Sequence, residues 1–229
     1  MILFALALIV AQSPPLAPFD FIKQATQLNC LMSDDECLGR EFTLREKADQ
    51  GARRASASDL GCAEIDQVCL SAAWSRVDDD NLSRLQAIVS ARGWPPLEGE
   101  AARGAWLIAQ HADPSPAGSE RAFRDLVIPM VWVEVAAGRL KPADYARMID
   151  RNALADGKHQ PFGTNQPCRN GEFDRTSIDS VEEVDQRRQQ IGMDIMLWQS
   201  LPLWDSNCER ATRSSAQPVA PAPAGTPPR

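Results

Sequence analysis

The chain lacks several sequence signatures that mark common functions. It has 24 Lys and Arg against 31 Asp and Glu, which gives a net charge of −7. A nucleic-acid-binding surface needs clustered cations to neutralise phosphates, so we expect no nucleic-acid partner. No P-loop is present, nor are the motifs Gly-x-Ser-x-Gly, His-Glu-x-x-His and Gly-x-Gly-x-x-Gly. These absences argue against the enzyme classes that such motifs identify.

The six cysteines also lack the spacing of a zinc site. The chain contains no Cys-x2-Cys pair, and it has only two histidines to complete a ligand set. An even number of cysteines behind an export-type start instead predicts structural disulfides in an oxidising compartment. We expect Cys168 and Cys208 to tie a polar loop to the end of the chain.

The other four cysteines belong to a weak repeat with a period of 32 residues, in which Cys30 and Cys37 correspond to Cys62 and Cys69. Within one continuous helix the two sulfurs of a pair would lie about 10 Å apart, so the bridges would have to join different helices. A turn between the cysteines, such as a capping box over residues 33–36, would make the bridges local. The sequence leaves both arrangements open.

The chain begins with an apolar run of eleven residues from Met1 to Ala11, followed by a proline-rich stretch. At about 1.5 Å per residue, this run cannot cross a hydrocarbon core of about 30 Å as a helix. The small residues Ala11 and Ser13 suit a cleavage site, so we predict a signal peptide over 1–13, although no Lys or Arg precedes the run. We therefore expect a periplasmic or secreted protein with no membrane span after cleavage.

Hydrophobic periodicity predicts a mainly α fold, a multi-helix domain with a short β-hairpin in an irregular polar loop. The hairpin is expected around Asn170-Gly171, within a loop that covers 159–178. Helix signals predict helices over 34–55, from Asp79 or Asp80 to residue 92, and over 100–112, 120–137, 142–156 and 181–201.

Composition divides the chain into three parts after the signal peptide. A cysteine-containing N-terminal helical segment covers 14–75, and a core over 42–204 overlaps it. A Pro/Ala-rich C-terminal tail over 210–229 is expected to be disordered, because it cannot bury enough apolar area to offset its ordering entropy.

Three polar clusters interrupt apolar surroundings, and such interruptions are typical of functional sites. The first is Gln110–Asp113. His111 closes the inward-facing stripe of its helix, so it is either a core histidine with one hydrogen bond or an acid or base. Asp113 opposes the helix dipole and therefore needs a partner, which is His111, an arginine, a cation or the following Asx turn.

The second cluster is Asp150-Arg151, with Asp150 at the edge of an apolar helix face. A charge in that position needs a partner. One interpretation is an ion pair between Asp150 and Arg53 or Arg188 of another helix. The other is a general base beside an arginine that holds an anion.

The third cluster, Gln160–Thr164, offers amide, hydroxyl and backbone N–H groups, and Gly163 permits unusual dihedrals or close approach of a ligand. It is either a ligand cradle or a tight turn. Taking the functional interpretation of all three clusters, we predict catalytic roles for His111, Asp113 and Asp150, and ligand-binding roles for Arg151, Gln160, Gly163, Thr164 and Arg188.

In their order along the chain, these residues resemble an uncharacterised bacterial family called domain of unknown function 6624. The matching elements are Asp49-Gln50 with Arg53, Gly93-Trp94-Pro95, Ala105-Trp106-Leu107, Gln110–Asp113, Asp150-Arg151, residues 160–165, and Arg188 with Gly192-Met193. The resemblance covers roughly 44–201 and departs from the family pattern at Phe162, where the family has Tyr, and at Asn165, where it has Gln. It implies a shared site whose chemistry it does not name, and it excludes a catalytic phenol at Phe162.

We therefore predict an exported enzyme of hydrolase or transferase type. His111 would act as acid or base, Asp113 or Asp150 would orient it, and Arg151 and Arg188 would bind an anionic group. The alternative is a noncatalytic envelope module that binds a peptide, glycan or partner, with polar clusters that only brace the fold. A metal site of His111, Asp113 and Asp150 would be a weak, nonspecific signature, so we predict no cofactor and a small-molecule, peptide or glycan ligand.

Overall fold

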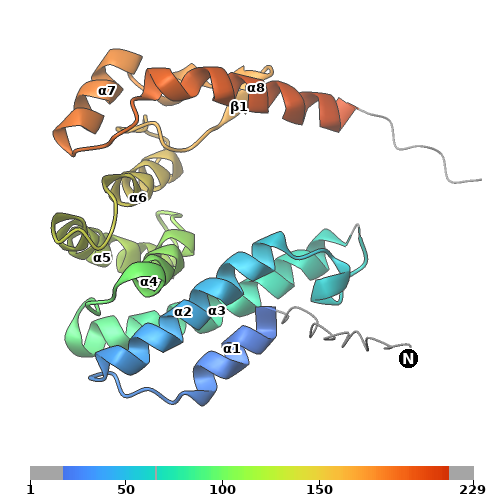
Figure 1. Cartoon of the computed structure of the whole chain (residues 1–229). Helices are drawn as coiled ribbons and strands as arrows, with labels where there is room; N and C mark the ends of the chain where they lie inside the picture. Colours follow the sequence, from blue (N-terminus) through green and yellow to red (C-terminus); the bar gives the residue numbers. More distant parts are fainter. Residues whose placement is uncertain (1–17, 65, 217–229) are drawn as a thin grey trace, which may run out of the picture. The chain divides into compact units, whose positions relative to one another are not determined.

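The computed structural model describes residues 18–64 and 66–216, which are mainly helical with one two-stranded antiparallel sheet (Figure 1). This confirms the predicted fold class. The predicted signal peptide and residues 217–229 of the predicted tail lie outside the described residues. The described residues form two compact units, unit 1 up to His111 and unit 2 from Ala112 onward, and the boundary between them falls inside the range 42–204 predicted as one core.

Unit 1 contains, in its described part, α1 (Pro18–Gln27), α2 (Asp35–Arg54), the 3₁₀ turn η1 (Ser58–Leu60), α3 (Gln67–Arg92) and α4 (Gly99–His111). The prediction was correct to within one residue for α2 and α4. It was wrong for the start of α3, because Asp66 caps this helix, well before Asp79 and Asp80, and its carboxylate accepts a hydrogen bond from the N–H of Cys69.

Both Cys-x6-Cys pairs form local disulfides, Cys30–Cys37 and Cys62–Cys69, so a turn separates the cysteines of each pair. In the first copy the helix cap is Asp34, which accepts a hydrogen bond from the N–H of Cys37. The N-cap residue is therefore Asp34, and the prediction of Ser33 as the capping residue of a box over 33–36 was wrong. In each copy of the repeat, the disulfide links the segment before a helix to the first turn of that helix, which is α2 in the first copy and α3 in the second.

The helices α2 and α4 run in the same direction and touch at Gly104. A Cβ on Gly104 would lie 2.5 Å from the carbonyl oxygen of Phe42 and 3.0 Å from the Cβ of Glu46, so only glycine fits there. The sequence offset between Phe42 and Gly104 is the same 62 residues that separates Asp49 from His111. Two helical turns beyond the close contact, this register brings His111 onto Asp49.

Unit 2 contains, in its described part, α5 (Ser119–Ala136), α6 (Pro142–Ala155), β1 (Cys168–Arg169), β2 (Glu172–Phe173), η2 (Arg175–Ser177), α7 (Val181–Gln190) and α8 (Leu197–Ala216). The helices predicted over 120–137 and 142–156 are confirmed. The hairpin is confirmed too, since Asn170 and Gly171 both have positive φ between β1 and β2.

The single helix predicted over 181–201 is wrong. Gly192, with φ of +77°, follows the end of α7, and the chain breaks before α8 begins. α8 continues to Ala216, so the first part of the predicted tail is helical. The predicted Cys168–Cys208 disulfide is confirmed and joins β1 to α8.

A small apolar core holds the C-terminal half of unit 2 together, and its buried members are Phe173, Ile178, Val184 and Leu197. Across the described residues, none of the helices combines the length and apolar character that crossing a bilayer requires.

Candidate functional site

His111 ends α4 and contacts α2 through its ring. Its Nδ1 lies 2.8 Å from Oδ1 of Asp49, a carboxylate that is 1% exposed, while the imidazole is 18% exposed. Because Asp49 is buried and fixed, its hydrogen bond to Nδ1 orients the imidazole, and Nε2 is not used in this contact. The sequence left open that His111 is a core histidine with one hydrogen bond. The ring does have such a bond, but it is also partly exposed to solvent.

Arg53, one turn after Asp49 on α2, links this pair to a second carboxylate. Its Nη1 donates to Oδ1 of Asp49 at 2.8 Å, and its Nη2 lies 3.0 Å from each oxygen of Asp78 on α3. Asp49, Arg53, Asp78 and His111, here called the unit 1 cluster, therefore join three helices of unit 1. Gln50 adds a hydrogen bond to the remaining oxygen of Asp49 at 2.7 Å.

The two carboxylates of the unit 1 cluster have opposite pKa shifts. Burial would raise the pKa of Asp49, but the hydrogen bond and charge of His111, with Arg53 and Gln50, lower it below its usual value. For Asp78, burial raises the pKa and the charge of Asp49 adds to this effect, while Arg53 only partly opposes it. Divergent environments of this kind cluster at functional sites.

The unit 1 cluster has the composition of a ligand set as well as of a proton-transfer pair. Asp49, Asp78 and His111 each offer one ligand atom, and these atoms lie within 4.8 Å of one another. Imidazole nitrogen and carboxylate oxygen are donors that divalent transition metals accept. The chemistry available here is therefore the binding or activation of a small polar group at an imidazole and two carboxylates.

The carboxylate that orients His111 is Asp49, which corrects the expectation that Asp113 or Asp150 has this role. Asp49 and Arg53 had a sequence signal, because Asp49-Gln50 with Arg53 is one of the elements on which the predicted family resemblance rests. Asp78 was missed as a site residue. It begins a run of three aspartates in α3, and nothing in the pattern distinguishes the member that pairs with Arg53.

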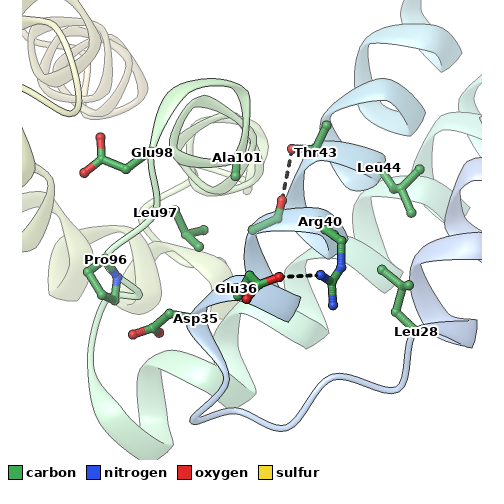
Figure 2. A pocket seen from close by; sticks show the side chains of 11 residues that line it. Leu28, Asp35, Glu36, Arg40, Thr43, Leu44, Pro96, Leu97, Glu98 and Ala101 are labelled. Atoms are coloured by element: carbon green, nitrogen blue, oxygen red, sulfur yellow. Dashed lines mark hydrogen bonds and ion pairs between the residues drawn. The ribbon is translucent and has the colours of Figure 1, made fainter.

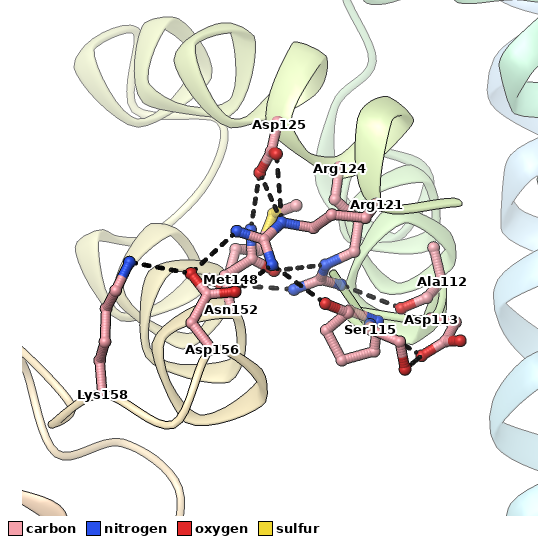
Figure 3. A network of polar contacts seen from close by, with 11 residues as sticks. Ala112, Asp113, Ser115, Arg121, Arg124, Asp125, Met148, Asn152, Asp156 and Lys158 are labelled. Atoms are coloured by element: carbon pink, nitrogen blue, oxygen red, sulfur yellow. Dashed lines mark hydrogen bonds and ion pairs between the residues drawn. The ribbon is translucent and has the colours of Figure 1, made fainter. Parts of the chain in front are cut away.

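Asp113, in unit 2, forms the Asx turn that was one of its predicted alternatives. Its Oδ1 accepts hydrogen bonds from the N–H of Ser115 at 3.0 Å and from its hydroxyl at 2.7 Å (Figure 3). The Ser115 hydrogen bonds lower the pKa of Asp113, and the charge of Arg151 adds to the effect. Arg151 is half-buried on α6, and its ligand-binding role stays a prediction, as does the catalytic role of Asp113.

A polar network behind this turn holds α5 to α6 (Figure 3). Its centre is Arg124, fully buried, which donates to the side chain of Asn152 and to the carbonyls of Ala112 and Met148. Burial, with the charges of nearby arginines, lowers the pKa of Arg124 to about 10. These contacts satisfy backbone and side-chain groups of unit 2, so the network has a structural role.

Asp150 fastens the loop that carries the third polar cluster. Its Oδ1 accepts from the N–H of Phe162 at 2.8 Å, and its Oδ2 accepts from the N–H and hydroxyl of Thr164 at 2.6 and 2.7 Å. Burial raises the pKa of Asp150, although these hydrogen bonds oppose the shift. Since Asp150 is 0% exposed and both oxygens are used, its geometry supports a structural role, and its catalytic role stays a prediction.

Arg188 fastens the same loop from α7. It donates through Nε to the carbonyl of Phe162 at 2.7 Å and through Nη2 to that of Gly163 at 2.9 Å. A third donor reaches the carbonyl of Ile195 at 3.0 Å. Arg188 is 2% exposed, so its contacts favour loop support over the predicted anion binding. Instead of the ion pair that was one interpretation of Asp150, Asp150 and Arg188 each hydrogen-bond the backbone of the same loop.

Gln160 and Gly163 complete this arrangement from within the loop. The side chain of Gln160 is buried and hydrogen-bonds the backbone of Asn165 in both directions. Gly163 has φ of +55°, and a Cβ there would lie 3.2 Å from the side chain of Leu197. The glycine therefore serves the backbone conformation, and packing occupies the space that a ligand would need. The ligand-binding roles of Gln160, Gly163 and Thr164 stay predictions.

The structure thus places six of the eight predicted site residues in two groups, and Asp113 and Arg151 belong to neither. His111 belongs to the unit 1 cluster, whereas Asp150, Gln160, Gly163, Thr164 and Arg188 form a closed hydrogen-bonded loop in unit 2. The loop corresponds to the tight-turn alternative. The candidate functional site is therefore the unit 1 cluster.

Unit 1 also contains a groove of about 750 Å³ formed by α2, the segment before α4 and the start of α4 (Figure 2). Apolar side chains of Leu28, Leu44 and Leu97 line it, and Figure 2 shows Glu36 paired with Arg40 beside them. No predicted site residue lines this groove.

Comparison of the chain with protein-family models, with curated proteins and with solved structures found no match. The resemblance to domain of unknown function 6624 accordingly stays a prediction.

Proposed function

We propose that this protein is an exported enzyme of hydrolase or transferase type whose reactive centre is the unit 1 cluster. The observation that carries the proposal is the meeting of a partly accessible imidazole with two carboxylates, one 1% and the other 31% exposed. Such a set can bind and activate water or a hydroxyl for attack on an acyl, phosphoryl or glycosyl group. Three disulfides are compatible with the exported location.

The placement of the cluster supports the proposal. Asp49 is buried and held by three partners, so it can fix the imidazole without moving. A purely structural ion pair would not require the side chains of His111 and Asp78 to be partly exposed to solvent. The half-buried guanidinium of Arg53 supplies positive charge beside the two carboxylates.

The second histidine of the chain provides a matched control for an activity test. His159 also pairs through Nδ1 with an aspartate, Asp179, at 2.7 Å, but it is 56% exposed and lies in unit 2. Purified wild type, His111→Ala and His159→Ala would be assayed against chromogenic esters, phosphoesters and glycosides. Loss of a positioned proton-handling group costs about 10²–10⁴-fold in rate.

We expect turnover of at least one substrate class, a loss of that size in His111→Ala and an unchanged rate in His159→Ala. Equal rates in wild type and His111→Ala would reject the proposed centre. Absence of turnover across all three classes would reject this form of the hydrolase assignment.

The groove favours a second candidate function, a noncatalytic module that binds a peptide or an apolar ligand. Its apolar lining and its separation from the unit 1 cluster suit binding without chemistry. Leu97→Asp would place a charge in the groove. Equal substrate turnover by Leu97→Asp and wild type would show that the groove takes no part in catalysis. Loss of peptide or apolar-ligand binding in Leu97→Asp would support the noncatalytic binding function.

A further inference from the structure

Three helices of unit 1 bring an unusual donor set to one point. Asp49 comes from α2, Asp78 from α3 and His111 from α4, and their ligand atoms lie within 4.8 Å of one another. Two atoms bound at about 2.0–2.2 Å from one ion lie at most about 4.4 Å apart, so small side-chain rotations are needed to bring all three ligand atoms around one ion. Rigid helices, one of them in backbone contact with another at Gly104, carry these donors.

The charge at this point is unbalanced. Two carboxylates face one guanidinium, that of Arg53, which hydrogen-bonds both of them. With a neutral imidazole the cluster carries one net negative charge, and partly buried charge of that kind attracts a cation. Arg53 is a side chain on a long flexible stem and is 28% exposed, so it can leave the carboxylates without unfolding α2.

We propose that Asp49, Asp78 and His111 bind a divalent first-row transition-metal ion. When the ion is absent, the guanidinium of Arg53 hydrogen-bonds the two carboxylates instead. This inference deepens the proposed function and rests on it for its catalytic meaning, because the ion would activate the nucleophile. It also revises the expectation, drawn from the sequence, that no metal is bound.

The exchange is balanced in charge and in protons. The ion accepts a lone pair from an imidazole nitrogen and one oxygen from each carboxylate, and water completes its coordination. If the liganding nitrogen carried the ring proton, that proton moves by exchange with water to the other ring nitrogen, so the bound imidazole stays neutral. The guanidinium keeps its charge and turns outward. Imidazole among the ligands favours Zn²⁺ over Mg²⁺ and Ca²⁺, which prefer oxygen donors.

The direct test is calorimetric titration of ZnCl₂ into chelator-treated full-length protein at pH 7, with MgCl₂ as the comparison. We expect one strong Zn²⁺ site in wild type. Loss of an outer-shell partner costs about 10–100-fold in metal affinity, so loss of a ligand in His111→Ala or Asp78→Asn should cost at least about 100-fold. His159→Ala, at the exposed histidine, should bind Zn²⁺ as wild type does.

Arg53→Met separates this proposal from a purely structural ion network. Removing the competing guanidinium should raise the Zn²⁺ affinity several-fold, and it should lower the melting temperature in the absence of metal but not at saturating Zn²⁺. A structural network predicts lower stability with and without Zn²⁺. This variant decides the question even where a ligand variant fails to fold, because it leaves all three ligands in place.

Three results would overturn the metal site: no Zn²⁺ binding by wild type, unchanged binding in His111→Ala, or unchanged or weaker binding in Arg53→Met. The two proposals remain distinguishable. Activity that depends on His111 but persists in chelator would support the proposed reactive centre and reject the metal site. Zn²⁺ binding that depends on His111, in a protein that turns over no substrate, would retain the site and remove the enzyme.

Discussion

Gly104 of α4 lies directly against the backbone of Phe42 of α2, so closely that a Cβ at residue 104 would be 2.5 Å from the Phe42 carbonyl oxygen. Backbone atoms cannot turn aside as a side chain can. The contact therefore sets the distance between α2 and α4, and with it the hydrogen bond between His111 and Asp49 two turns further on.

Gly104→Ala should destabilise unit 1. Alanine gains about 1 kcal/mol in helix propensity, but overpacking of this type costs about 1–3 kcal/mol and separates the helices. Urea unfolding would give the free energy, and zinc titration would report the cluster. Gly39→Ala is the matched control, because Gly39 lies in α2 with nothing within 4 Å of its Cβ position. Equal stabilisation by both alanines would contradict the tight contact.

Asp150→Asn should loosen the loop that Asp150 holds. An amide keeps one acceptor oxygen, so the N–H of Phe162 or of Thr164 loses its partner in a buried place, at about 1–3 kcal/mol. Hydrogen exchange of residues 160–166 would show faster opening. Asp194→Asn, at an exposed position, serves as the control. Unchanged exchange in Asp150→Asn would show that Arg188 and Gln160 hold the loop without it.

Unit 2 should lose an electrostatic contribution in acid. Hydrogen bonding to Arg121, with Lys158, lowers the pKa of Asp156 from 3.8 to about 2. A carboxylate whose folded pKa is depressed stabilises the protein above its unfolded pKa, near 3.8, and loses that contribution as pH falls through about 2. The stability gap between wild type and Asp156→Asn should therefore be wider at pH 5 than at pH 2. A gap independent of pH would rule out this linkage.

The three disulfides should contribute unequally to stability. Cys168–Cys208 closes 40 residues, whereas each local bridge closes only 7. In the chain-entropy account these loops correspond to about 4 and about 2 kcal/mol. Alanine pairs replacing Cys168 and Cys208 should lower the melting temperature of unit 2 more than the Cys62 and Cys69 replacements lower that of unit 1. The reverse order would show that native contacts, and not loop entropy, dominate.

Helical pattern and local stop signals were sufficient for much of the fold. Gly99–His111 has an apolar stripe at helical spacing and is followed by Asp113-Pro114, so both its helix and its end were predictable. The hairpin at Asn170-Gly171 follows equally from turn chemistry. The start of α3 was missed because Asp66 and Asp79 both suit a helix cap, and the sequence ranks neither.

The partners of the site residues depend on which helices meet. Asp150 has the same mid-helix pattern whether it takes a proton from a substrate or accepts hydrogen bonds from the backbone N–H groups of a loop, and only the path of residues 160–164 decides this. Asp78 shares its sequence context with two neighbouring aspartates, and only the packing of α3 on α2 selects it for Arg53.

The sequence by itself determined the helical character of the chain and most helix boundaries. Those features follow from local periodicity, capping and composition, which act within a few residues. Tertiary structure alone decided that His111 pairs with Asp49, 62 residues away, and that Asp78 completes the cluster. The physical reason is that a side chain meets a distant partner only where helices pack in one register, and a missing Cβ at Gly104 permits that register between α2 and α4.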